Sequence, residues 1–243
     1  MKKIIIVIPA RYASKRFPGK PLAKILGIPM IVRVATIAKK VKGINAIVIA
    51  TDDKKIVKVC KKYNLEYLMT SKNCLTGTDR LSEVAKKIKA DVYVNLQGDE
   101  PLVLQNDIKK VIKEKILHND QVICGYTKLK KDEHESDNSI PKVVFNKEKY
   151  LMYISRSAVP GSKKKHSHYY KQVCIYAFNR KELMQFSKQK KKGIIEEIED
   201  IELLRYFDLN KKIKMVKVSG NSIAVDYPKD VRRVEKILEQ NNR

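Results

Sequence analysis

The sequence predicts an α/β fold built on a mostly parallel β-sheet. Short apolar runs typical of buried strands alternate with segments of helical apolar spacing through the first half of the chain. The first run, residues 4–8, leads directly into a basic loop, residues 8–22, that contains three prolines. Polar clusters follow several of the later runs. Ligands of open α/β sheets bind at the carboxyl ends of strands, so these clusters also predict where a ligand site lies.

Strands and helices are predicted to alternate strictly over the first half. After the basic loop, Pro29 suits the first turn of a helix, and one of the polar residues Thr51, Asp52 and Asp53 can cap the next one. The predicted strands are residues 4–8, 46–50, 66–69 and 91–96. The predicted helices are residues 30–41, 54–63, 79–89 and a segment from Asn106 or Asp107 to Leu117. This β-α-β order implies right-handed crossovers and a parallel sheet.

The second half has a different pattern. Strand-like runs occur at residues 122–126, 142–145, 150–154 and 172–178, and no helical pattern separates the first three. A mixed or antiparallel extension of the sheet is therefore expected. Residues 160–168 form a polar loop. Helices are predicted at residues 182–187, 194–209 and 231–238, the last capped within residues 226–230, and strands at residues 214–218 and 222–225.

Length and composition favour one large domain, residues 1–243, to which residues 122–215 contribute the mixed part. No apolar run is long enough to cross a bilayer. The amino terminus resembles the start of a signal peptide, but its apolar run is too short and ends at Pro9, so a cytoplasmic protein is expected. The four cysteines lack CxxC spacing and nearby histidines, which argues against a zinc site or a disulfide framework.

The formal net charge of +25 raises the possibility of nucleic-acid binding. The excess, however, is spread along the chain as lysine, without an aromatic-interleaved patch or a known reader module. A nucleic-acid-binding protein therefore stays a remote alternative, and no nucleic-acid partner is expected. The charge would also raise the local concentration of small polyanionic substrates.

The basic loop carries four cations, Arg11, Lys15, Arg16 and Lys20, beside Gly19. Its prolines exclude a regular helix or an inner strand, so the cations are expected at the end of the first strand. Because glycine allows close backbone approach and several cations attract charged oxygens, a phosphate chain is the expected ligand. A solvated surface loop is the alternative, but two of the few arginines in this lysine-rich chain lie here.

Three further clusters follow strands or open helices. Residues 76–80 place a glycine where a helix begins, which suits an anion, although a helix cap by Thr78 or Asp79 explains the pattern equally well. Residues 97–101 place Asp99 beside a glycine, as a Mg²⁺ ligand or as part of a tight turn. In residues 224–228, Asp226 is a second candidate ligand or the cap of the last helix. Neither a GxxxxGK[ST] nor a GxGxxG motif is present.

These motifs together resemble those of the 3-deoxy-manno-octulosonate cytidylyltransferases (CMP-Kdo synthetases). The matching motifs, in the family's order and spacing, are residues 8–22, 50–53, 76–80, 95–101 and 225–230. The resemblance implies a Rossmann-like, mostly parallel nucleotide-binding sheet of the nucleotide-diphospho-sugar transferase type with a small mixed α+β dimerisation subdomain. It also implies a Mg²⁺-dependent homodimer that converts CTP and a 3-deoxy-ulosonic acid, most simply Kdo, into CMP-sugar and pyrophosphate for lipopolysaccharide or capsule synthesis.

The resemblance implies roles for individual residues as well. Arg11, Arg16 and Lys20 are expected to hold the triphosphate, with Lys20 stabilising charge on the α-phosphate and the departing pyrophosphate. The implied nucleotide-binding residues are Ala10, Arg11, Arg16, Lys20, Thr76, Gly77 and Arg80. The implied catalytic residues are Lys20, Arg16 and Asp99, and the implied Mg²⁺ ligands are Asp99 and Asp226.

The sugar side of the expected site contains one departure from the family. Gln172 stands where the family usually has a histidine, and a glutamine forms hydrogen bonds but carries no proton charge. A modified octulosonic or nonulosonic acid is therefore an alternative substrate. The candidate sugar-binding residues are Gln97, Arg156, Gln172, Tyr176 and Glu202. A helical apolar face containing Ile198, Ile201 and Leu204 is the candidate dimer surface.

Overall fold

The computed structural model describes residues 2–14, 16–161, 163 and 168–241. Lys15, and Lys164 and His166 in the predicted loop 160–168, lie outside the described residues. The described strands are β1 (Ile4–Ala10), β2 (Lys24–Ile25), β3 (Ile28–Pro29), β4 (Ala46–Thr51), β5 (Glu66–Met69), β6 (Val92–Leu96), β7 (Val122–Lys128), β8 (Lys142–Phe145), β9 (Leu151–Ser155), β10 (Tyr170–Phe178) and β11 (Ile213–Lys217).

The described helices alternate with these strands in the first half of the chain. They are α1 (Met30–Lys39), α2 (Lys54–Lys62), α3 (Gly77–Lys87), α4 (Gln105–Leu117), α5 (Arg180–Phe186), α6 (Ile194–Glu199), α7 (Arg205–Asp208) and α8 (Pro228–Asn241), with short 3₁₀ turns η1 (Lys20–Leu22) and η2 (Glu202–Leu204). None of the helices in the described part of the chain has the length and apolarity needed to cross a membrane.

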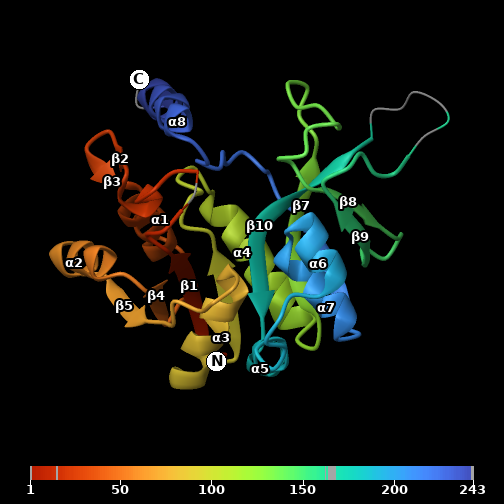
Figure 1. Cartoon of the computed structure of the whole chain (residues 1–243), viewed down its shortest axis with the longest axis horizontal. Coiled ribbons are helices and arrows are strands. Elements are labelled where there is room, and N and C mark those ends of the chain that lie inside the picture. Colours follow the sequence, from red (N-terminus) through yellow and green to blue (C-terminus); the bar gives the residue numbers. More distant parts are fainter. Residues whose placement is uncertain (1, 15, 162, 164–167, 242–243) are drawn as a thin grey trace.

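The main sheet has the strand order β11-β7-β10-β6-β1-β4-β5, and β8 and β9 extend it from β10 (Figure 1). β6, β1, β4 and β5 are parallel neighbours, whereas β10 runs antiparallel to both β6 and β7. The β8–β9 hairpin lies at the side of the molecule away from β4 and β5 (Figure 1). The predicted α/β class, parallel first half and mixed second half are confirmed.

Strand β1 shows why the central sheet is buried on both faces. Ile4, Ile6 and Ile8 pack into one apolar cluster with residues of α1 and α4, while Ile5 and Val7 pack into a second with residues of α3 and α5. Successive side chains of a strand point to opposite faces, so an unbroken apolar run is what a strand covered on both sides requires. The parallel pairing of β1 with β6 also brings their carboxyl ends to the same edge of the sheet.

Two predicted elements are wrong. Residues 194–209 are not one helix, because Asp200 adopts a left-handed conformation (φ 49°) after α6 and the chain continues as η2 and α7. The turn directs Ile201 and Leu204 into the core, so only Ile198 of the predicted dimer face is exposed. Residues 222–225 are not a strand either; a hydrogen bond from Val225 N to the Asp99 main-chain oxygen (2.9 Å) holds this segment instead.

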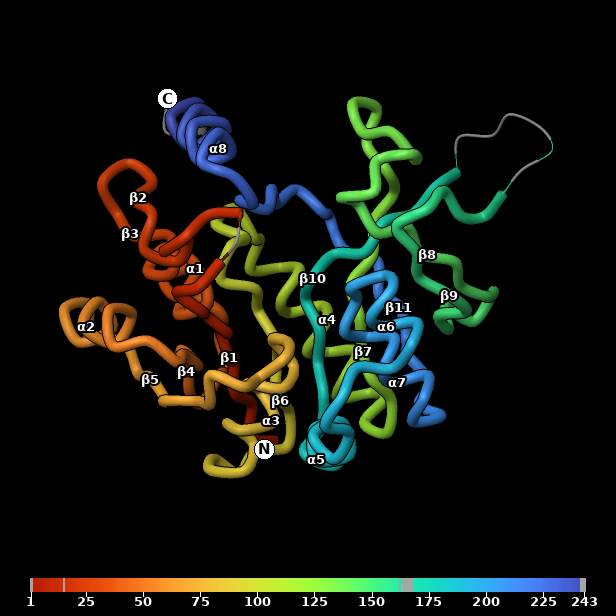
Figure 2. The backbone as a smooth tube through the Cα atoms, in the orientation of Figure 1, coloured from red at the N-terminus to blue at the C-terminus, as the bar shows by residue number. Residues whose placement is uncertain are grey.

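Smaller differences concern local elements and caps. The β2–β3 hairpin and the turn η1 follow the basic loop without having been predicted. Thr76, rather than Thr78 or Asp79, caps α3, so this helix begins at Gly77. The last described element is α8, which packs beside the β2–β3 hairpin, where Leu26 N donates to Glu235 (2.8 Å; Figure 2).

Candidate active site

Three charged side chains meet at the carboxyl edge of β1 and β6. The Lys20 ammonium lies 2.5 Å from Asp99 Oδ2 and 3.3 Å from Asp226 Oδ1. Arg16 forms a second ion pair with Asp226, at 2.9 Å. Lys20 and Asp226 are 206 positions apart in the chain, and the fold brings them together. The basic loop and the two candidate carboxylates therefore form one cluster, as the sequence predicts.

The backbone around Lys20 accounts for its position. Gly19 is left-handed (φ 71°), and its N–H donates to the Tyr12 main-chain oxygen at 2.9 Å. A Cβ on Gly19 would come 3.2 Å from the Tyr12 ring, so a larger residue is disfavoured both by conformation and by space. This tight turn starts η1 at Lys20 and directs the basic loop back over the end of β1.

Asp230, and not Asp226, binds the backbone at the start of α8. Asp230 Oδ2 accepts from Asp226 N at 2.9 Å and from Tyr227 N at 2.8 Å. The Asp226 carboxylate instead faces Lys20 and Arg16. The sequence left open whether Asp226 caps the last helix, and the structure assigns these cap bonds to Asp230.

The donor set of this cluster fits Mg²⁺. Mg²⁺ prefers carboxylate oxygens and commonly takes one or two of them together with substrate phosphates. Asp99 and Asp226 supply two such groups around a single ammonium. Burial, with smaller contributions from the charges of Asp99 and Asp226, raises the pKa of nearby Glu100 to about 7. No group of three or more His, Cys, Asp or Glu side chains suited to a metal occurs among the described residues, so other ligands would come from substrate and water.

The amino end of α3 lies beside the end of β1. Thr76 and Asp79 form a capping box, in which Thr76 N donates to Asp79 Oδ2 at 2.8 Å. Glu202 Oε2 accepts from Thr78 N at 2.8 Å. A Cβ on Gly77 would lie 3.3 Å from Pro9, so Gly77 brings this loop close to β1. Ala10 is buried at the end of β1, and Arg11 is exposed just after it.

Arg80 is buried and fully engaged by neighbouring loops. Its guanidinium forms an ion pair with Asp52 at 2.5 Å and donates to Thr70 Oγ1 at 2.7 Å. Arg80 thus joins the loop that follows β4 to the loop that follows β5. Asp52 belongs to the matching motif 50–53, but its position in the sequence did not identify Arg80 as its partner.

The candidate sugar-binding residues lie in two places. Gln172 Nε2 donates to the Tyr176 hydroxyl at 2.7 Å, and Tyr176 is paired with Asn95 across β10 and β6. Asn95 Nδ2 in turn lies 3.4 Å from Glu202 Oε1, and burial raises the pKa of Glu202. Gln97 follows β6 directly. The sequence did not single out Asn95, whose buried Oδ1 has no hydrogen-bond partner among the described residues.

Arg156 lies at the second place, at the carboxyl end of α6. Its guanidinium donates to the main-chain oxygens of Glu199 at 2.5 Å, Asn138 at 2.9 Å and Asp200 at 3.2 Å. These bonds fasten the end of α6 to the loop after β9. In this structure Arg156 therefore binds main-chain carbonyls, and the sugar-binding role expected of it stays a prediction.

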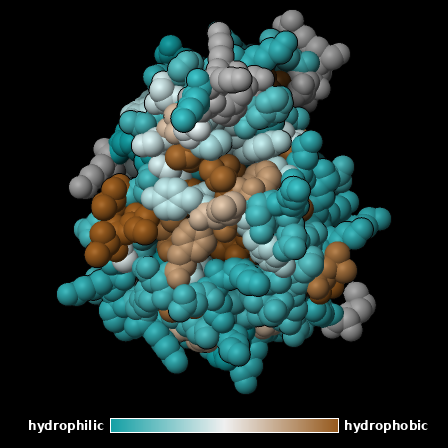
Figure 3. Space-filling view, turned by 90° about the vertical axis from the view of Figure 1, so that its right-hand side faces the viewer, coloured by the Kyte–Doolittle hydropathy of each residue, from teal (hydrophilic) through white to brown (hydrophobic). Residues whose placement is uncertain are grey.

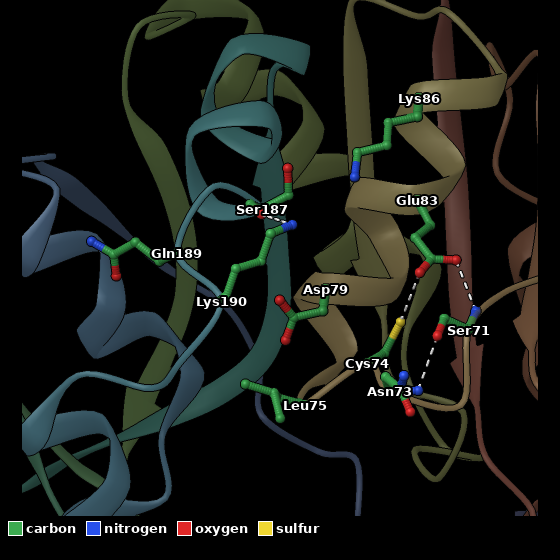
Figure 4. Close-up of a pocket in the computed structure, with 10 residues that line it drawn as sticks. All are labelled: Ser71, Asn73, Cys74, Leu75, Asp79, Glu83, Lys86, Ser187, Gln189 and Lys190. Atoms are coloured by element: carbon green, nitrogen blue, oxygen red, sulfur yellow. Dashed lines mark hydrogen bonds between the residues drawn. The ribbon is translucent and has the colours of Figure 1, made fainter.

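A cavity of about 300 Å³ lies between α3, the loop before it and the segment after α5 (Figure 4). Asp79 and Leu75 border it, and within its wall Cys74 Sγ and Ser71 N donate to Glu83 at 3.4 and 2.8 Å (Figure 4). None of the predicted site residues lines this cavity. The charged cluster at the sheet edge is therefore the candidate active site.

Comparisons with known proteins show which family the chain resembles. The profile of the cytidylyltransferase family matches residues 5–213. The 3-deoxy-manno-octulosonate cytidylyltransferase of Desulfosudis oleivorans is 37% identical over 243 residues, covering 97% of each chain. The 8-amino-3,8-dideoxy-manno-octulosonate cytidylyltransferase of Shewanella oneidensis is 36% identical over 97% of this chain and 98% of its own. The structure of a CMP-2-keto-3-deoxy-manno-octonic acid synthetase complexed with CTP has a TM-score of 0.92 and 34% identity, covering 98% of this chain and 99% of that one.

Proposed function

The chain belongs to the cytidylyltransferase family, among the CMP-Kdo synthetases, and from that premise we propose that it transfers CMP from CTP to the anomeric hydroxyl of Kdo. The observation that carries this proposal is the cluster of Lys20, Arg16, Asp99 and Asp226 at the carboxyl edge of the sheet. The cluster combines cations for a triphosphate with carboxylates for Mg²⁺. The likeness in fold to a synthetase complexed with CTP supports CTP as the nucleotide.

The proposed reaction is an in-line displacement at phosphorus. The sugar hydroxyl oxygen forms a bond to the α-phosphorus and gives up its proton to solvent, the bond from that phosphorus to the bridging oxygen breaks, and pyrophosphate leaves with the electron pair. Such reactions depend mainly on positioning and on stabilisation of charge. Arg11 and Arg16 bind the phosphates, while Lys20 stabilises the charge that develops on the α-phosphate and the leaving group. The net charge of +25 attracts these polyanionic substrates.

Mg²⁺ would be held by Asp99 and Asp226. When bound, it supplies Lewis-acid charge neutralisation of phosphate oxygens. The chain's own residues prepare its place, since Val225 N bonds to the Asp99 main-chain oxygen and so fixes the two carboxylate-bearing segments against each other. Thr76, Gly77, Ala10 and Arg80 are proposed to form the cytosine and ribose side, with Gly77 allowing close approach.

Kdo and its 8-amino analogue are the two candidate sugars. Relatives named for each are almost equally similar to this chain. Gln172 is the reason to retain 8-amino-Kdo as a candidate. A histidine at this position would change charge with pH, whereas the glutamine amide stays neutral and offers both a hydrogen-bond donor and an acceptor. Its bond to Tyr176 joins two of the residues that we propose to bind the sugar, and Gln97, Glu202 and Arg156 are the other three.

The substrate prediction is tested by pyrophosphate release from CTP and Mg²⁺ with Kdo, 8-amino-Kdo and a nonulosonic acid. We expect kcat/KM for Kdo to be the highest, and the nonulosonic acid to be slower by about tenfold or more, because a misfitted polar substrate leaves buried groups unpaired. ATP, GTP and UTP replace CTP as controls for the nucleotide. Higher kcat/KM with 8-amino-Kdo would establish the second candidate, and no release with any acid would contradict the proposed function.

We also propose that the mixed part of the chain, residues 122–215, forms a homodimer surface through α6 and β9. Ile194, Ile198 and Met152 are 79%, 77% and 63% exposed there. Figure 3 views the side that lies to the right in Figure 1, and an apolar patch crosses the middle of this otherwise hydrophilic face. Contiguous exposed apolar side chains of this kind are typical of association surfaces.

Replacement of Ile198 by lysine is expected to shift the protein toward monomer, because a charge at the centre of an apolar contact must be buried without a partner. Sedimentation velocity over a range of concentrations measures the change. Leu117→Lys is the matched control, since Leu117 is also an exposed apolar residue (65%) but lies at the end of α4. A dimer that is unaffected by Ile198→Lys would show that this face is not the contact.

A further inference from the structure

Arg205 is a completely buried charge to which neither the motifs nor the proposed reaction assigns a role. Its side chain is 0% exposed and its guanidinium forms a fork with Glu196, with Nε–Oε2 at 2.7 Å and Nη2–Oε1 at 2.6 Å. The same group lies over the Phe186 ring, 3.9 Å from its centroid. A buried guanidinium is tolerated only where its hydrogen bonds are satisfied. The acceptor of its third nitrogen therefore indicates which other part of the fold Arg205 positions.

That partner is Asp79, in the loop proposed to bind the nucleotide. Arg205 Nη1 donates to Asp79 Oδ1 at 2.9 Å. The other oxygen of Asp79 accepts from Thr76 N and from Thr76 Oγ1, both at 2.8 Å. One carboxylate therefore joins Arg205 to the residue that caps α3, directly before Gly77.

The segment that carries Arg205 makes a second contact with the same loop. Glu202, three residues earlier, accepts from Thr78 N at 2.8 Å. The two contacts reach Thr76 through Asp79 and reach Thr78 directly, so they hold the residues on either side of Gly77 in place. Burial acts to lower the pKa of Arg205, but its hydrogen bonds to Glu196 and the charge of Asp79 outweigh it and raise the pKa, so the group stays charged.

The other end of α6 is attached independently of Arg205. Glu199 accepts from Ser155 Oγ at 2.6 Å and from Arg156 N at 2.7 Å, which binds α6 to β9. A change at Arg205 is therefore expected to loosen the amino end of α3 while α6 stays attached to the sheet.

We propose that Arg205 is a positioning residue for the nucleotide, which acts through Asp79 on Thr76 and Gly77 without contacting the ligand. The inference rests on the proposed function, because it takes the amino end of α3 to be part of the CTP site. Ligand affinity depends steeply on the direction of N–H groups at such a site, and small displacements lower it. The role predicts an effect on CTP binding that is separate from any effect on stability.

The chain contains a matched control for this role. Glu182 and Glu196 are both buried, each at the third position of a short capped helix, and each pairs with a buried cation. Glu182 pairs with Lys115 at 2.8 Å, whereas Glu196 pairs with Arg205. Neither Glu182 nor Lys115 is hydrogen-bonded to residues 76–79 in the described structure. Loss of the Glu182 charge therefore removes a buried ion pair without removing a contact to residues 76–79.

The test compares Arg205→Lys, Glu196→Gln and Glu182→Gln with the wild type. Arg205→Lys keeps the charge but loses the fork that spans Glu196 and Asp79. It is expected to raise both the Kd and the KM of CTP about tenfold, with kcat and the KM of the sugar within about twofold. Glu196→Gln is expected to give about a threefold rise, and Glu182→Gln to lower Tm with CTP affinity unchanged. Calorimetric titration with CTP and Mg²⁺, steady-state kinetics and thermal unfolding supply these values.

Arg205→Lys with CTP affinity within twofold of the wild type would overturn the proposal, whatever its Tm. If Arg205→Lys does not fold, Glu196→Gln decides in the same way, because it weakens the hold on Arg205 without removing the buried cation. An equal loss of CTP affinity in Glu182→Gln would also overturn it, since the effect would then follow stability alone. Wild-type protein that did not bind CTP would contradict the proposed function itself, a result distinct from these.

Discussion

Lys20→Ala is expected to lower kcat about 100- to 1,000-fold, the usual effect of removing one preorganised group that stabilises transition-state charge. The Lys20 ammonium contacts both Asp99 and Asp226. Its side chain is 15% exposed and belongs to a short 3₁₀ turn at the sheet edge. Its removal therefore leaves the two apolar clusters of the core intact, and Tm is expected to change little.

The variant also separates two functions of the cluster. Lys20 competes with Mg²⁺ for the same two carboxylates, so its removal is expected to leave Mg²⁺ binding as tight as in the wild type or tighter, while turnover falls. Initial rates at saturating CTP and a Mg²⁺ titration measure the two effects. Lys24→Ala is the control, because Lys24 is exposed in β2, four positions further along the chain. Turnover of Lys20→Ala equal to that of the wild type would exclude the charge-stabilising role.

Asp99→Asn is expected to shift the midpoint of the Mg²⁺ dependence about tenfold or more to higher concentration, because an amide oxygen lacks the charge that a carboxylate contributes to a hard cation. The same change at Asp226 is expected to act in the same direction and also to release Arg16, its partner at 2.9 Å. The measurement is the rate of pyrophosphate release as a function of Mg²⁺ at fixed CTP.

Asp91→Asn is the matched control for Asp99→Asn. The two aspartates flank the same strand, β6, at its amino and carboxyl ends, and Asp91 Oδ2 accepts from Lys3 N at 2.7 Å. This control changes the same charge at the opposite edge of the sheet and is expected to leave the Mg²⁺ midpoint unchanged. An unaltered titration in Asp99→Asn would remove Asp99 from the metal site, and an equal shift in Asp91→Asn would indicate a general effect of net charge.

Much of the site's location follows from local sequence. An apolar run buried on both faces can only be an inner strand, so the residues after β1 and β6 had to lie at one edge of the sheet. Lys20 and Asp99 were therefore predictable neighbours. Asp226 was a candidate for the same edge, although it follows no described strand and is held there by the bond from Val225 N to Asp99.

Other predictions failed or stayed open where local pattern and packing compete. Residues 194–209 have helical apolar spacing, but the left-handed Asp200 breaks it and buries Ile201 and Leu204 in the core. The spacing of apolar residues does not predict that turn, because the turn is stabilised by burial against residues that are distant in the chain. The expected roles of Arg80 and Arg156 also depend on partners, Asp52 and the carbonyls at the end of α6, that lie 28 and 43 positions away.

The sequence by itself determined the alternation of strands and helices in the first half of the chain and the charged residues that follow β1 and β6, because both depend on residues that are near one another in the chain. Only the tertiary structure decided the partner of each charge. Arg205 and Asp79 are 126 positions apart, and nothing in either neighbourhood indicates that they meet. A buried ion pair forms where packing brings two groups together and excludes water, and the sum of many long-range contacts determines that packing.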